Sequence, residues 1–136
     1  MDDFSNPKAY TVGLICALTI EQVAARCFLD KEHPRMKSQA ASDNNSYTLG
    51  EIGEHNIVIA GLPLGRYGTT NAAAVARDMV RTFPNIRLGL LVGVGGGAPS
   101  GKHDIRLGDV VVGMLLSGKN EILQYNFGKT IQKRKF

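Results

Sequence analysis

The stretch Tyr10-Thr11-Val12-Gly13-Leu14-Ile15-Cys16-Ala17-Leu18 decides the fold of this chain. It is almost continuously apolar, which is typical of a strand covered on both faces, as in a parallel sheet. Thr19 and Gln22 follow with the spacing of a capping box, so we expect a helix to begin there and to end before Pro34. Helical spacing places five apolar side chains on one stripe, which we expect to face the sheet: Ile20, Val23, Ala24, Cys27 and Phe28.

A hairpin is expected further along the chain. Residues 35–46 are polar and predict a surface loop. Residues 46–52 and 56–61 flank Gly53-Glu54-His55, and this pattern predicts two antiparallel strands joined by a tight turn.

A second helix and further strands are expected after the hairpin. Thr69 or Thr70 is expected to cap the helix, and Pro84 to stop it. Residues 87–94 and 109–114 predict two buried strands. The apolar residues of the helix share one face (Ala72, Val75, Ala76, Met79, Val80 and Phe83), and the start of another strand is indicated by the alternation of Leu123, Tyr125 and Phe127.

Strands that alternate with helices predict an α/β fold with a mixed, mostly parallel central sheet flanked by helices. Residues 1–136 have the length of one domain, without a repeat or an internal linker. The expected core of the sheet is Leu14, Ile15, Ile57, Val58, Leu90, Val92, Val110 and Val112.

Composition and charge exclude several classes of protein. With 43% hydrophobic and 21% charged residues, the chain is expected to fold. The net charge of +4 comes from a basic tail over 129–136: without its four basic residues, 16 − 4 = 12 basic residues face 12 acidic ones. We therefore expect no nucleic-acid-binding face, and the chain has neither a signal pattern nor a membrane span. These features predict a cytoplasmic protein.

The cysteines predict neither a metal site nor a redox site. Cys16 and Cys27 have no zinc or redox spacing, and both lie among apolar residues. We expect both to be buried, reduced thiols.

A glycine-rich loop, Gly93-Val94-Gly95-Gly96-Gly97-Ala98, follows one of the expected strands. Its spacing loosely fits a dinucleotide-binding motif, but that motif needs a helix directly after the loop to receive the pyrophosphate. Pro99-Ser100-Gly101 stands there instead, which disfavours a redox domain and any cofactor. The glycines still allow a ligand to approach the backbone and expose successive N–H groups, although a plain tight turn is an equal possibility.

Four segments in register resemble the nucleoside phosphorylase family, which includes purine nucleoside phosphorylases, uridine phosphorylases and methylthioadenosine/S-adenosylhomocysteine nucleosidases. The likeness is closest to fungal versions that often stand at the head of NACHT, ankyrin or tetratricopeptide proteins, and residues 125–132 look like the following segment of that branch. The four segments are Val12-Gly13-Leu14-Ile15-Cys16-Ala17-Leu18 with Glu21, Gly65-Arg66-Tyr67-Gly68-Thr69, Leu90-Leu91-Val92-Gly93-Val94-Gly95-Gly96, and Leu107-Gly108-Asp109-Val110-Val111-Val112.

The resemblance implies cleavage of the N-glycosidic bond of a purine nucleoside or nucleotide. Glu21 falls where the nucleosidases carry the glutamate that activates water, and is the candidate catalytic residue; its plainer interpretation is an acid in a first helical turn. Arg66 would either face a 5′ phosphate or simply be exposed. The candidate substrate-binding residues are Gly65, Arg66, Gly93, Val94, Gly95 and Gly96.

Departures from the family favour water over inorganic phosphate as the nucleophile. Cys16, Leu91 and Val94 stand where phosphorylases present phosphate or ribose contacts, and these side chains cannot bind an anion. The resemblance also implies that residues 1–136 are only the N-terminal part of the domain. The base-binding residues, the ribose clamp and the acid for the leaving base lie in the other half.

A truncated domain of this kind has several consequences. We expect an incomplete catalytic domain with an unpaired sheet edge and no turnover by itself. We expect either a homo-oligomer or an association with a second half-domain, and the latter would restore the missing half. The alternative is a non-catalytic interaction or regulatory module derived from the same fold.

Overall fold

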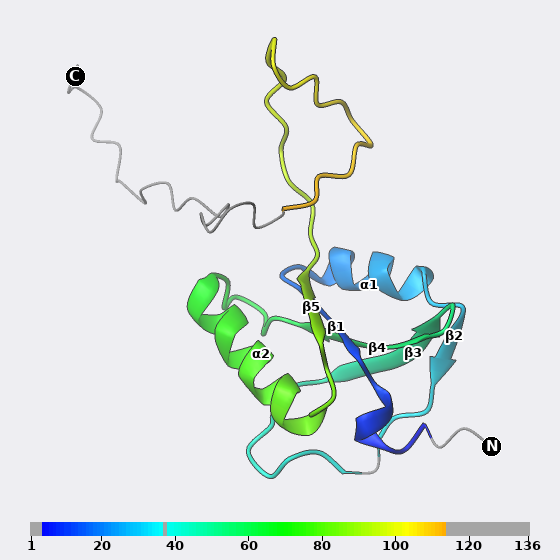
Figure 1. The fold of residues 1–136 in the computed structure, drawn as a ribbon. Coiled ribbons are helices and arrows are strands. Elements are labelled where there is room, and N and C mark those ends of the chain that lie inside the picture. The colour runs from blue at the N-terminus through cyan, green and yellow to red at the C-terminus, as the bar shows by residue number, and fades with distance from the viewer. Residues whose placement is uncertain (1–3, 37, 114–136) are drawn as a thin grey trace, which may run out of the picture. The chain divides into compact units, whose positions relative to one another are not determined.

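The computed structural model describes residues 4–36 and 38–113, which divide between two compact units over 1–95 and 96–136. All helices and strands of the described residues belong to the first unit (Figure 1). In the second unit, described over 96–113, Ser100 and His103 exchange backbone hydrogen bonds, and the Arg106 guanidinium pairs with Asp104 at 2.6 Å.

A five-stranded sheet in the order β2-β3-β4-β1-β5 forms the centre of the first unit. β1 is parallel to β4 and to β5, whereas β3 is antiparallel to β2 and to β4. The predicted mixed sheet is therefore confirmed, but it is not mostly parallel, since two of its four pairings are antiparallel. The strands are β1 (Val12–Cys16), β2 (Lys31–His33), β3 (Tyr47–Ile52), β4 (His55–Gly61) and β5 (Leu88–Leu91), and the helices are α1 (Thr19–Cys27), α2 (Thr69–Thr82) and a 3-10 turn, η1 (Pro7–Ala9).

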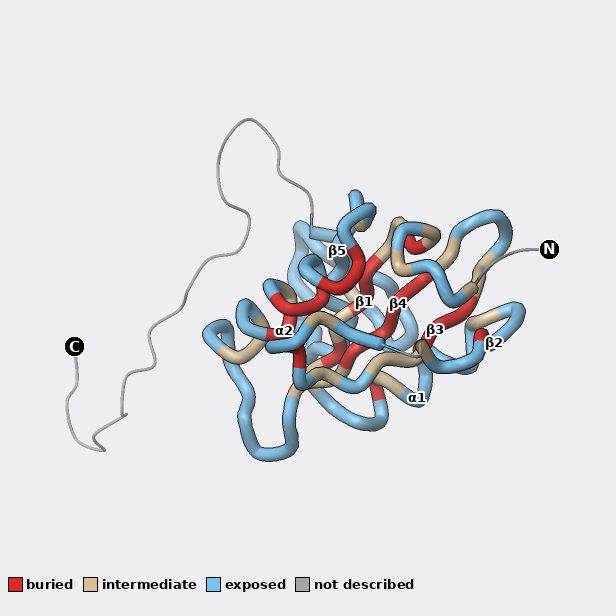
Figure 2. The backbone as a smooth tube through the Cα atoms, turned by 90° about the horizontal axis from the view of Figure 1, so that it is seen from below, coloured by how far each residue is buried: buried red, intermediate tan, exposed pale blue. Residues whose placement is uncertain are grey.

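The sheet has a hydrophobic core on each face. Side chains of β4 alternate between the two: Val58 and Ala60 pack with α2, and Ile57 and Ile59 pack with α1. Figure 2 shows the buried residues gathered on β1 and β4, the middle of the sheet. The complete clusters are Tyr10, Leu49, Val58, Ala60, Val75, Met79 and Phe83 on one face, and Leu14, Cys16, Ala25, Ile57 and Ile59 on the other.

The expected core is confirmed for the middle strands and wrong at the β5 end. Leu90 and Val92 are 41% and 38% exposed, because β5 pairs with β1 alone among the described strands. Residues 109–113 form no strand, so Val110 and Val112 are also exposed. The expected strand start at Leu123, Tyr125 and Phe127 lies outside the described residues, as does the basic tail over 129–136.

The predicted capping box and apolar stripe of α1 are both wrong. Leu18, not Thr19, is the N-cap residue, and its N–H donates to the Glu21 carboxylate. The helix buries Glu21 and Ala25, because the carboxylate is turned inward to meet backbone N–H groups and this sets the rotation of the helix. The expected stripe faces outward: Ile20 is 72% exposed, Val23 53% and Phe28 75%, and Ala24 and Cys27 are exposed too.

The buried face of α2 agrees with the prediction. Val75, Met79 and Phe83 are at most 3% exposed, whereas Val80 is half-exposed. The cap differs, because Gly68 with a φ of 104° precedes the helix and neither threonine caps it.

Two elements next to the hairpin depart from the sequence expectations. The helix expected to end before Pro34 ends at Cys27, and β2 follows it and pairs with β3 at the sheet edge. The loop over 35–46 is polar but is not a simple surface loop. The Asp43 carboxylate in it is buried and accepts hydrogen bonds from the hydroxyls of Tyr47 and Thr82, which fastens the loop to β3 and α2.

Candidate functional site

The three parallel strands of the first unit end at one edge of the sheet. Cys16 at the end of β1 is in register with Gly61 of β4, and Ile15 is in register with Leu91 of β5. The loops that follow these strands therefore leave from the same edge. Ligands of open α/β sheets bind beyond such carboxyl ends.

Glu21 joins two of these loops through its carboxylate. The residue is 7% exposed. Its Oε2 accepts a hydrogen bond of 2.8 Å from the N–H of Leu18, at the start of α1. Its Oε1 accepts one of 2.8 Å from the N–H of Val94, in the glycine loop after β5. Both oxygens are thus held by backbone donors from segments far apart in the sequence.

These hydrogen bonds control the ionisation of the site. The N–H groups of Val94, and then of Leu18, hold the pKa of Glu21 below its ordinary value of 4.5, against burial, which raises it. The carboxylate is therefore ionised at neutral pH. Burial first, and then the charge of Glu21, raises the pKa of the Cys16 thiol, so Cys16 stays neutral. Cys16 is buried as expected, but Cys27 is exposed.

Two glycines at this edge lie close to side chains of α1. A Cβ on Gly93 would lie 2.8 Å from Glu21 Oε1, and a Cβ on Gly61 would lie 2.7 Å from Gln22 Oε1. Gly95 has open space around the position of a Cβ. The contact of Gln22 with Gly61 was missed from the sequence, since nothing in a strand-ending glycine says which distant side chain approaches it.

Gly65 and Arg66 lie in a turn of the loop after β4. The N–H of Arg66 donates to the Pro63 carbonyl at 2.9 Å, Gly65 has a φ of 74°, and the Arg66 side chain is exposed. Among residues 4–95, no hydrogen bond joins this turn to Glu21 or to the glycine loop. Gly96 opens the second unit, and its role as a binding residue stays a prediction.

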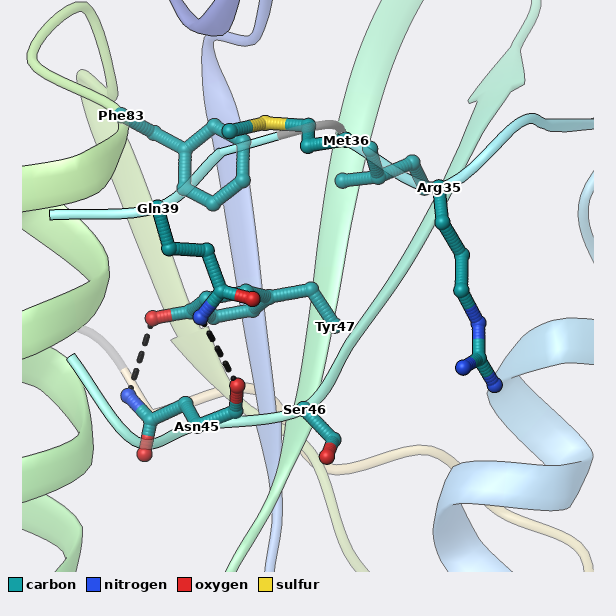
Figure 3. A pocket seen from close by; sticks show the side chains of 8 residues that line it. Arg35, Met36, Gln39, Asn45, Ser46, Tyr47 and Phe83 are labelled. Atoms are coloured by element: carbon teal, nitrogen blue, oxygen red, sulfur yellow. Dashed lines mark hydrogen bonds between the residues drawn. The ribbon is translucent and has the colours of Figure 1, made fainter.

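A pocket of about 130 Å³ lies away from Glu21, between the 35–46 loop, β3 and the end of α2 (Figure 3). Much of its polar lining is paired internally: Asn45 donates to the Tyr47 hydroxyl, and Gln39 donates to the Asn45 carbonyl. The Arg35 guanidinium points away from the other labelled side chains. The lining residues are Arg35, Met36, Gln39, Asn45, Ser46, Tyr47, Leu49 and Phe83, and none was a candidate from the sequence.

Two other kinds of feature are absent from residues 4–36 and 38–113. Within these residues, no cluster of three or more His, Cys, Asp or Glu side chains is arranged to hold a metal ion. None of the helices there has the length and apolar character needed to cross a membrane.

A fungal protein shares much of this sequence. The chain is 50% identical over 123 residues to a protein of Hyaloscypha variabilis named nucleotide-binding leucine-rich repeat (NLR)-like protein. The match covers 90% of this chain but only 12% of that relative. No family model matches the chain, and no solved structure matches it. A fungal relative with an NLR-like name fits the expected context of fungal multidomain proteins.

Proposed function

We propose that residues 1–136 supply the N-terminal part of a nucleoside phosphorylase-like domain that cleaves the N-glycosidic bond of a purine nucleoside or nucleotide. The observation that carries the proposal is the contact of Glu21 with Gly93 and Val94 at the carboxyl edge of the parallel strands. These residues belong to two of the segments that resemble the family, and the fold brings them together.

The chemistry requires a negative group beside the ribose. A water oxygen bonds to C1′ as the C1′–N bond breaks, the bonding pair leaves with the base, and a donor protonates that base. The ribose becomes positively charged on the way, which a fixed carboxylate stabilises. Glu21 is ionised and buried, and a carboxylate has about four lone-pair sites, so it retains acceptor capacity for a water beyond Leu18 and Val94.

The lowered pKa of Glu21 refines its proposed role. A carboxylate held by two backbone donors is a weak base, and proton transfer works best when the pKa of the base lies near the working pH. Glu21 is thus better suited to orient the water and to stabilise the ribose cation than to remove a proton early. The proton of the water passes to the Glu21 carboxylate as the bond to C1′ completes, because the oxygen bonded to C1′ is then strongly acidic.

The neighbouring loops would hold the rest of the substrate. Gly93 and Gly95 would allow the ribose to approach the backbone, and the exposed Arg66 beside Gly65 would meet a 5′ phosphate. Water is favoured over phosphate as the nucleophile, because the Val94 N–H already binds Glu21 and the side chains of Cys16 and Val94 offer no anion site.

Nitrogen-15 NMR of the full chain tests this proposal. Adenosine and methylthioadenosine should shift the amide signals of Leu18, Val94 and Gly95, and inorganic phosphate alone should not. Gly93→Ala should abolish the shifts, because its Cβ would displace the carboxylate. Gly89→Ala in β5 is the matched control, since a Cβ there meets nothing within 4 Å. Unchanged amide signals with millimolar nucleoside, or equal shifts in Gly93→Ala, would contradict the proposal.

The second candidate is a non-catalytic interaction module, and one observation favours it. The apolar stripe of α1 faces outward, with Ile20, Val23 and Phe28 all more than half exposed, as in a surface that binds another chain. In that case the chain would not bind nucleosides. Its sedimentation would instead depend on concentration, and Val23→Glu would remove that dependence.

A further inference from the structure

His33 lies buried in a chain of hydrogen-bonding groups at the β2 end of the sheet. Its side chain is 0% exposed. Nδ1 lies 3.0 Å from the Tyr10 hydroxyl, and Nε2 lies 3.1 Å from Oε2 of Glu51. The Tyr10 hydroxyl also lies 3.2 Å from the carbonyl oxygen of Phe4, whose ring stacks on the imidazole with centroids 3.8 Å apart. The N-terminal segment is thus seated directly on His33.

Counting hydrogens shows that these contacts need a protonated imidazole. The Tyr10 hydroxyl has one hydrogen but faces two acceptors when His33 Nδ1 carries a lone pair. The opposite neutral tautomer satisfies Tyr10 but turns the Nε2 lone pair toward the Glu51 carboxylate. Only the imidazolium donates to both Tyr10 and Glu51, and it leaves the Tyr10 hydrogen for the carbonyl of Phe4.

The charged groups around His33 act in opposite directions. Glu51 of β3 favours the imidazolium by direct contact. Lys31 of β2 carries a positive charge that opposes it, and its Nζ lies 4.8 Å from the centroid of the Phe4 ring. Burial, and then Glu51, raises the pKa of Tyr10 to about 12, so Tyr10 keeps its hydrogen throughout the neutral range.

We propose that His33 is a proton-dependent latch for residues 4–9. When His33 is protonated, the path from Glu51 through His33 and Tyr10 to the Phe4 carbonyl is complete and the segment is held on the sheet. When the imidazole loses its proton, one hydrogen bond of this path is lost and the hold on Phe4 weakens. The hold is therefore complete while the imidazole is charged and weakens when rising pH leaves it neutral.

The signals of the Phe4 ring in NMR spectra of the full chain report whether the segment is seated, because stacking on an imidazole shifts them. Loss of one buried hydrogen bond should lower the ratio of seated to released segment roughly three- to tenfold between about pH 5 and pH 8. His33→Gln should remove this pH dependence. His55→Gln, at an exposed histidine of β4, is the matched control and should retain it.

Two further variants test the same latch if the His33→Gln protein does not fold. Tyr10→Phe keeps the ring but removes the hydroxyl that relays between His33 and Phe4, and should give a flat pH profile. Glu51→Gln should also flatten the profile, because the glutamine amide can donate to a neutral Nε2 and leaves the Nδ1 hydrogen for Tyr10. Phe4 signals that do not respond to pH in the unaltered chain, seating that tightens as pH rises, or a normal profile in Tyr10→Phe would overturn the proposal.

Discussion

Replacing Glu21 by glutamine tests whether its carboxylate fastens the glycine loop to α1. The substitution keeps the size of the side chain but removes its charge. Only one terminal atom of glutamine accepts hydrogen bonds, so a single N–H of Leu18 or Val94 keeps its partner. The other N–H then faces the amide nitrogen, and two donors point at each other.

The expected cost follows from this geometry. A hydrogen bond to a charged group contributes about 1.5–3 kcal/mol, and the residue is 7% exposed, so solvent replaces little of what is lost. Glu21→Gln should therefore lower the free energy of unfolding by about 2–3 kcal/mol at neutral pH. Glu54→Gln, at an exposed residue of the hairpin turn, should change it by less than about 0.5 kcal/mol.

Urea denaturation at several pH values provides the assay. The folded-state pKa of Glu21 lies below the ordinary value of 4.5, so its stabilising contribution is present above that value. The contribution is lost as pH falls through the depressed folded-state pKa, because Glu21 of the unaltered chain is then protonated and uncharged, like the glutamine of the variant. The difference between the two proteins should shrink accordingly. A Glu21→Gln protein as stable as the parent, or a difference that does not change with pH, would refute the reasoning.

Two other predictions concern the core and the activity. Ile59→Ala should cost about 2–5 kcal/mol of unfolding free energy, because Ile59 is 0% exposed, whereas Ile20→Ala should cost less than about 0.5 kcal/mol, because Ile20 is 72% exposed; equal costs in urea denaturation would contradict this assignment of the core. The purified chain alone should release no adenine from adenosine, methylthioadenosine or ATP, since no segment matches the base donor of the family, and losing that donor costs about 10²–10⁴ in rate. Chromatography of the free base measures this, and release abolished by Glu21→Gln would show the prediction wrong.

Elements governed by local chemistry were predictable from the sequence. The hairpin has its turn at Gly53, where the φ of 56° suits glycine, and alternating apolar residues on either side. The buried face of α2 agrees with its helical spacing as well. In both elements, neighbours in sequence determine the conformation, and no distant contact opposes them.

The rest depends on contacts between distant residues. The helical spacing of the apolar residues in α1 predicts that Ile20 and Val23 face the sheet. In the structure the Glu21 side faces inward instead, where its carboxylate accepts hydrogen bonds from Leu18 and Val94. Thr82, far along the chain, is one of the groups that bury Asp43 in its polar loop.

For the site, the resemblance placed Glu21 and Gly93 among the candidate residues, but no chemistry in the sequence indicated that Glu21 would lie against Gly93. Neither motif nor composition indicated that Gln22 would approach Gly61. The relay through Tyr10, His33 and Glu51 was equally hidden, because its members come from three separate segments.

The central position of β1 has a consequence for the order of folding during synthesis. Val12 pairs with Ile57 and with Leu88, so β1 leaves the ribosome long before either neighbour exists. The β3–β4 hairpin joins residues close in sequence and closes soon after it emerges, because short loops cost little entropy. The first strand of the chain is therefore among the last to be enclosed, and its apolar residues need shielding until Leu91 has been made.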